Sequence, residues 1–193
     1  MLYMNGKRLL FSPHIHLDGY ENGRKDLLNL ITENGENFSY MFCFRNINED
    51  PGLDLSTAKN LVFIFTSCRN LTTINNFNAP MCEIVDGAFA DCIQLVSIYN
   101  IDISNVLESV DPIFGRCESL ENLTFIGPIN ISVLALQDSP KLTIESLRNI
   151  INALTDFSDN PGQHELVLNI ESLEKLTDDD LANISSKGWE VYS

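Results

Sequence analysis

The chain has 193 residues, and 44% of them are hydrophobic, which is enough to bury a continuous core without the help of disulfides. Its formal net charge is -15, from 12 basic and 27 acidic residues, so phosphate backbones and anionic membranes would be repelled. This charge excludes nucleic acid as an expected partner. No apolar run approaches the length of a membrane span, so membrane insertion is not expected either.

Residues 1–37 are predicted to form a small β-hairpin followed by a linking segment. The Asn-Gly pair at residues 5–6 favours a tight two-residue turn, which predicts a hairpin over residues 3–17. The opening residues have no long apolar region and no small-residue cleavage site, so no signal peptide is predicted. His14 and His16 alternate onto one strand face, a spacing that metals use, but no third ligand lies nearby in the sequence. Ordinary strand histidines are the favoured interpretation.

An internal repeat occupies residues 38–142. Three segments share the pattern Phe-x-x-Cys-x-x-Leu-x-x-Ile, with leucine at the last position of the third copy. Successive phenylalanines are 24 and 25 residues apart, and the cysteines keep the same two steps. The twelve residues at the shared positions are Phe65, Cys68, Leu71, Ile74, Phe89, Cys92, Leu95, Ile98, Phe114, Cys117, Leu120 and Leu123.

The repeat extends further in weaker form. Four residues before each phenylalanine stands another apolar residue, which is Leu61, Val85 or Val110. A degenerate copy precedes the three clear ones at Tyr40-Met-Phe42, although arginine stands where the others have cysteine. A later copy keeps the spacing with Leu136 in place of phenylalanine and Ser139 in place of cysteine. Weakened outer copies are typical of the ends of a repeat array.

A repeat of this length predicts a solenoid, in which each coil buries its apolar faces against its neighbours. The Leu-x-x-Ile stretch and the apolar residue after it (Phe77, Tyr99 or Phe125) are predicted to form short parallel strands, with the phenylalanine on the opposite wall. Cysteine is expected at the corner between the walls, where a small side chain fits near turn backbone and serine can substitute. The five cysteines are odd in number and form no C-x-x-C pair, so we expect reduced thiols. A metal-binding row of cysteines is the alternative.

Residues 143–193 are predicted to form an α/β cap. A first helix is expected after the N-cap Thr143, followed by a strand at 165–169, a second helix that opens at Thr177, and a terminal strand at 189–192. The apolar face of the first helix consists of Ile144, Leu147, Ile150, Ile151 and Leu154. Three aspartates at 178–180 suit the positive end of the second helix, and a cation site is the alternative interpretation.

These residues resemble the BspA-like leucine-rich repeats, most closely at residues 40–42 and 87–92. The resemblance covers residues 38–145 and implies a curved solenoid used for adhesion or protein contact, with no catalytic residues to carry over. The closing section resembles the C-terminal cap of such repeat proteins encoded by tailed phages and prophages of gut bacteria. The expected fold class is α/β, a leucine-rich-repeat solenoid with a short parallel sheet, an N-terminal β-hairpin and an α/β C-terminal cap.

No nucleophile motif, metalloprotease motif, phosphate loop or dinucleotide fingerprint occurs in the sequence, so neither catalysis nor a cofactor or metal is expected. The resemblance implies a structural or attachment component of a phage virion, assembled in the host cytoplasm and localised to the particle. Its partners would be other virion proteins, further copies of itself or a host-surface receptor. A bacterial surface adhesin and a free protein-binding module remain alternatives, and the missing export signal counts against the adhesin.

Overall fold

The computed structural model describes the backbone of residues 2–4 and 7–9, and residues 35–193 completely. Strands β1 (Leu2–Met4) and β2 (Lys7–Leu9) pair antiparallel, with Met4 opposite Lys7. The hairpin predicted from the Asn-Gly pair is confirmed to this extent, while its turn residues and residues 10–17 lie outside the described part of the chain. The alternation proposed for His14 and His16 lies outside it as well.

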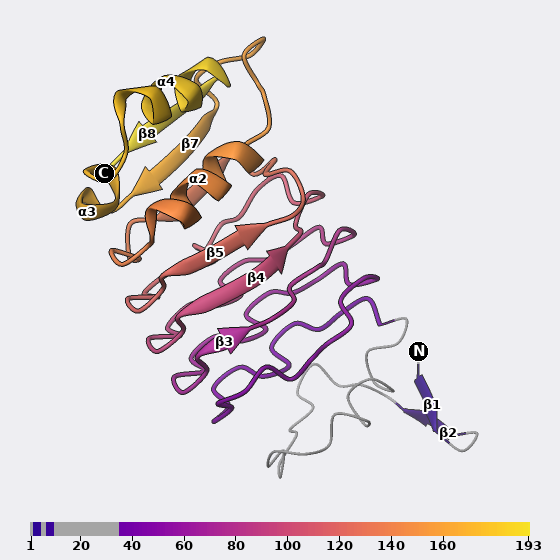
Figure 1. The fold of residues 1–193 in the computed structure, drawn as a ribbon. Coiled ribbons are helices and arrows are strands. Elements are labelled where there is room, and N and C mark those ends of the chain that lie inside the picture. The colour runs from indigo at the N-terminus through magenta and orange to yellow at the C-terminus, as the bar shows by residue number, and fades with distance from the viewer. Residues whose placement is uncertain (1, 5–6, 10–34) are drawn as a thin grey trace.

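From residue 35 onward the chain forms layers that follow one another in sequence order (Figure 1). Four successive layers each have a turn-rich segment that contains one of the phenylalanines Phe42, Phe65, Phe89 and Phe114, and these segments together are called the turn wall below. The backbone N–H groups of Phe42, Phe65 and Phe89 each donate to a carbonyl in the next layer, at 2.8 to 2.9 Å. The turn wall therefore has an inter-layer hydrogen-bond ladder although it is not a regular sheet, which satisfies backbone groups that would otherwise be buried without partners.

On the opposite side of these layers lies a parallel sheet of three short strands. Its order is β3 (Thr73–Ile74), β4 (Ser97–Ile101) and β5 (Asn122–Phe125), in the sequence order of the layers. Ile98 of β4 pairs with Ile74 on one side and Leu123 on the other, and all three side chains are buried. The repeated isoleucine or leucine therefore faces the interior between the sheet and the turn wall.

Tyr99 lies in strand β4, as the repeat predicts, but its side chain does not join the core. The register of β4 against β5 shifts after Ile98, so that Ile101 pairs with Phe125 and β4 holds one extra residue. Asn100, within the irregular stretch, takes a left-handed backbone conformation with φ of 54°. Consequently Ile101 is buried, whereas Tyr99 points outward and is 37% exposed.

Helix α2 (Ile144–Ala153) takes the place of a further strand beside β5 (Figure 1). The hydroxyl of Ser146 accepts from the N–H of Leu123 at 3.0 Å, and the side-chain carbonyl of Asn149 accepts from the N–H of Phe125 at 2.6 Å. These two side chains satisfy backbone donors at the edge of the sheet, which blocks the edge against pairing with another strand. The helix and its predicted N-cap at Thr143 are confirmed.

The remaining elements form a second parallel sheet with helices. Strands β6 (Val133–Leu136), β7 (His164–Leu168) and β8 (Trp189–Tyr192) lie in that order, and helix α4 (Asp178–Ser186) connects back to β8. The predicted second helix and both predicted strands of this section are confirmed. A short helix that was not predicted, α3 (Ile170–Leu173), follows β7.

The fold is thus mixed α/β, with short parallel sheets and few helices. One cluster of buried side chains runs from Phe38 in the first layer to Trp189 in the last strand. The predicted boundary between residues 142 and 143 therefore falls within a continuous hydrophobic core. Leu142 and Leu147, on its two sides, both belong to that core.

Candidate functional site

The twelve residues of the repeat all lie in the interior, where none is more than 1% exposed. The rings of Phe42, Phe65, Phe89 and Phe114 form a stacked column, with successive centroids 5.4, 5.4 and 6.0 Å apart and planes within 14° of parallel. The leucines and isoleucines of the repeat belong to the same buried cluster. The structure thus brings these residues together as core, and none of them offers its side chain to a ligand.

The repeated cysteines form a second column beside the rings. The thiols of Cys68, Cys92 and Cys117 donate to the carbonyls of the phenylalanines one layer earlier, at 3.0, 3.0 and 3.2 Å. In the next layer, Ser139 replaces cysteine and its hydroxyl donates to the carbonyl of Cys117 at 3.4 Å. The corner therefore needs a small side chain with a donor that reaches turn backbone, which both cysteine and serine supply.

These thiols are poorly suited to chemistry. Burial raises the pKa of Cys92 to about 12 and that of Cys82 to about 11, and burial likewise raises the pKa of Cys68 and Cys117. A thiol with so high a pKa stays protonated at neutral pH, whereas nucleophilic attack and metal binding require the thiolate. All five cysteines, including the half-buried Cys43, are free of disulfides.

The aspartates at 178–180 form the first turn of helix α4. Asp180 forms a capping box with Thr177, and its carboxylate also lies 3.2 Å from the guanidinium of Arg148. Hydrogen bonds from Arg148 and then from Thr177 lower the pKa of Asp180 to about 2. Within residues 35–193 no three histidine, cysteine, aspartate or glutamate side chains gather closely enough to hold a metal ion.

The clearest departure from the repeat is at Val110. The pattern aligns it with Leu61 and Val85, but the structure places its side chain differently from theirs. Leu61 and Val85 are fully buried, whereas Val110 is 89% exposed. The carboxylate of Asp86 holds the displaced segment, accepting from the N–H of Val110 at 2.9 Å and from the hydroxyl of Ser109 at 2.8 Å.

Pro112 supplies a physical reason for this departure. Two residues before the column phenylalanine, the earlier layers have Tyr40, Phe63 and Gly87, with φ of 60°, 52° and 55°. Each of these residues donates its N–H to a carbonyl of the next layer, at 2.9 to 3.1 Å. Proline has no N–H and its ring holds φ near -65°, so Pro112 can neither adopt that conformation nor make that hydrogen bond.

The inter-layer ladder of the turn wall is interrupted at this position. Within residues 35–193, no backbone hydrogen bond joins the 112–116 segment to strand β6, and the N–H of Arg116 donates instead to the carboxylate of Asp138 at 3.0 Å. By analogy with the earlier layers, the carbonyl of Val133 is the group that would have accepted from residue 112. Since residue 112 is proline, that carbonyl has no donor from the preceding layer.

A groove of about 240 Å³ lies between the displaced segment and β6. It is lined by Ser109, Val110, Pro112, Ile113, Val133, Leu134 and Ala135. Ile113 and Leu134 are buried at its base, while Val133 is 38% exposed. Next to it, Leu107 is 64% exposed, and its carbonyl accepts from the N–H of Ser132 at 2.8 Å. The groove therefore has an apolar lining and exposed apolar side chains beside it.

The surroundings of the groove are acidic. Glu108 and Asp111 are exposed on the displaced segment, and Glu165 of β7 pairs in register with Val133. The nearest basic side chain along this segment, Arg116, forms an ion pair with Asp91 at 2.7 Å. An apolar groove with acidic neighbours and one neutralised arginine is complementary to a basic partner.

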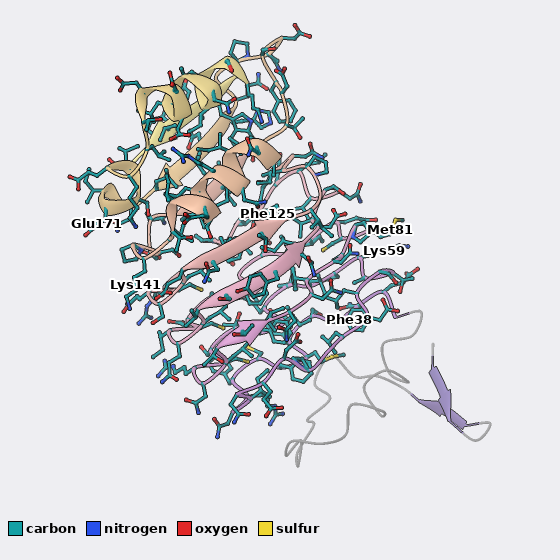
Figure 2. The ribbon with its side chains drawn as sticks, viewed as in Figure 1. Phe38, Lys59, Met81, Phe125, Lys141 and Glu171 are labelled. Carbon is teal, nitrogen blue, oxygen red and sulfur yellow. The ribbon has the colours of Figure 1, made fainter. Side chains whose placement is uncertain are left out.

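Two of the basic side chains, Lys59 and Lys141, lie at opposite edges of the layered structure. Figure 2 shows Lys59 and Met81 at one edge of the layered structure, whereas Lys141 and Glu171 lie at the opposite edge. Lys59 forms an ion pair with Glu36 at 3.0 Å, and Lys187 donates to the carbonyls of Ile151 and Leu154. Lys59 and Lys187 are therefore engaged in contacts within the structure.

The sequence contains two signals of the groove that the repeat alignment missed. One is Pro112 at a position that elsewhere has a left-handed backbone, and the other is the longer step of 25 residues between Phe89 and Phe114. Both indicate an irregular layer. Neither signal, however, indicates that the side chain of Val110 points outward.

Comparison with protein-family models, with curated proteins and with solved structures finds no match to this chain. Among the helices of the described residues, none combines the length and the apolar character needed to cross a bilayer.

Proposed function

We propose that this chain is a non-enzymatic leucine-rich-repeat solenoid of the BspA-like type that acts through protein–protein contact. The observation that carries the proposal is the layered core with one irregular layer on its turn wall. The twelve repeat residues are all buried in the core, and the irregular layer presents an apolar groove at the surface. Local departures from an otherwise regular pattern are where function is expected, because they cost stability that the rest of the fold must supply.

We further propose that the contact is made within a phage virion, as a structural or attachment component. The support for this step is the resemblance of the repeat and of the closing section to repeat proteins encoded by tailed phages and prophages. Other virion proteins are the preferred partners over further copies of this chain. Residues 35–193 hold 23 of the 27 acidic residues and only eight of the twelve basic ones, so two copies would repel each other.

The test is particle composition. Phage particles are purified on a density gradient from an induced culture that carries the gene, and peptides of this chain are sought by mass spectrometry. We expect the chain to band with the major capsid protein. Recovery only in the soluble fraction, or only at the cell surface, would contradict the virion proposal, and the second result would favour an adhesin.

A deletion tests how the chain is anchored. The N-terminal hairpin region is proposed as the anchor, because its strands β1 and β2 form a sheet separate from the two sheets of the layers and a two-stranded sheet has free edges for pairing. Deleting residues 1–20 should abolish incorporation while the circular dichroism of the remaining chain keeps its shape. Normal incorporation of the deletion variant would refute the anchoring role.

A further inference from the structure

We infer that the groove beside Val110 receives an apolar side chain from an extended, basic segment of a partner protein. The inference rests on the proposed function of protein contact and names the chemistry of the partner at this site. It follows from the size of the groove, from the charges around it and from the unpaired backbone at its wall.

The size of the groove favours a single side chain over a small-molecule ligand. Its volume of about 240 Å³ is below the range of about 300 to 1,000 Å³ that is usual for small-molecule sites. A cavity of about 150 Å³ is already sufficient for a benzene ring, so a leucine, isoleucine or phenylalanine side chain can enter this groove. The buried Ile113 and Leu134 at its base would be the apolar contacts of such a side chain.

The charges favour a basic partner. Glu108 and Asp111 flank Val110 within two residues on the displaced segment, and Glu165 lies beside Val133. Lysine or arginine residues next to the inserted side chain would therefore meet opposite charge on both sides of the groove. A second copy of this chain is a poor occupant, since its described part carries an excess of 15 negative charges.

The backbone favours an extended segment. Alternate residues of a strand direct their backbone groups to opposite sides, and the N–H of Glu165 donates to the carbonyl of Ser132 on the β7 side. The carbonyls of Val133 and Ala135 therefore face the interrupted ladder, where Pro112 offers no donor. An N–H or a lysine ammonium of an extended partner segment at the groove can supply the missing hydrogen bond.

The experiment measures binding of defined peptides to the full-length protein by fluorescence anisotropy. The probe is a fluorescein-labelled heptapeptide of alternating lysine and leucine. Two comparison peptides replace leucine by serine or lysine by glutamate. We expect the lysine–leucine peptide to bind at least about tenfold more tightly than either comparison peptide, because each of them lacks one of the two recognised features.

Two pairs of matched variants locate the site. Val110→Lys should weaken binding at least about tenfold, as the loss of an anchoring contact does. Ile126→Lys is its control, because it adds the same charge at an exposed apolar residue outside the groove. This control should leave the affinity within about twofold. Asp111→Asn should weaken binding about twofold to fivefold, and Glu145→Gln on α2 should not. All four positions are exposed, so folding is expected to be retained and is checked by circular dichroism.

The inference is overturned if the lysine–leucine peptide does not bind, if either comparison peptide binds equally well, or if Val110→Lys and Ile126→Lys weaken binding equally. The failure of the virion proposal is a separate result. If the chain is absent from particles but Val110→Lys abolishes peptide binding, the groove remains a binding site and only the virion proposal fails. If the chain is present in particles but does not bind the peptide, the virion proposal stands and the groove proposal fails.

Discussion

Replacing Phe89 with alanine tests the layered core at its centre. The side chain is fully buried and lies between two parallel rings, Phe65 at 5.4 Å and Phe114 at 6.0 Å. Phe77 from the sheet side meets it edge-on at 4.8 Å, with an interplanar angle of 62°. Phe89 thus contacts the rings of the layers before and after it and also Phe77, which lies three residues after the end of β3.

The magnitude follows from these contacts. Truncation of a buried phenylalanine to alanine costs about 3 to 5 kcal/mol, because the transfer free energy is lost and a cavity remains. Each aromatic pair contributes about 0.5 to 1.5 kcal/mol beyond burial, and three pairs are lost here. The cavity cannot close easily, since the N–H of Phe89 is hydrogen-bonded to the carbonyl of Ile113 in the next layer. We therefore expect a loss near the upper limit, about 5 kcal/mol.

The assay is equilibrium unfolding in urea, followed both by the fluorescence of Trp189, the single tryptophan, and by far-ultraviolet circular dichroism. Coincident transitions with the two probes justify a two-state free energy. Phe44→Ala is the matched control, because Phe44 is 78% exposed and its truncation should change the free energy of unfolding by less than about 0.5 kcal/mol. A loss below about 1 kcal/mol for Phe89→Ala would refute the proposed role of the column.

Three further predictions concern the thiols, the C-terminal section and pH. In the native protein a thiol reagent should modify Cys43 before the four buried cysteines, which should react only on unfolding, and modification of a second thiol in the native protein would contradict the buried column. Removing residues 143–193 should uncover the edge of β5 and make the remainder aggregate, as judged by light scattering, whereas a soluble, cooperatively folding fragment 1–142 would show that the section is separate. The lowered pKa of Asp180 means that its ionised form stabilises the fold above about pH 4, and that this contribution is lost as the pH falls towards 2. Arg148→Ala should accordingly destabilise the protein at pH 6 but have a smaller effect at pH 2.5, and an equal effect at both pH values would exclude the ion pair as the cause.

The core positions of the middle layers could be predicted from the sequence. The repeated phenylalanine, cysteine, leucine and isoleucine positions are all buried, and the spacing also placed Phe42, Leu136 and Ser139 in equivalent, buried positions. Capping chemistry likewise located the starts of α2 and α4 at Thr143 and Thr177. These features are local or periodic, so each is specified by residues that a single sequence displays.

The candidate site could not be predicted in the same way. Val110 and Tyr99 both carry the apolar character that the pattern requires, yet both are exposed. In each case a backbone irregularity changes the direction of the side chain, at Pro112 for one and at Asn100 for the other. Hydrophobicity at the right spacing therefore predicts where a side chain would be buried only if the backbone of that layer repeats as well.

The sequence by itself determined the period, the composition of the core and the excess of negative charge, because these are sums or spacings along the chain. Only the tertiary structure decided that Val110 points outward, that the ladder stops before β6 and that α2 occupies the edge of β5. Each of these depends on which backbone donors and acceptors of neighbouring layers meet, a relation between residues 22 to 25 positions apart. A single missing N–H at Pro112 is enough to break that relation, and its effect on the next layer becomes visible only in three dimensions.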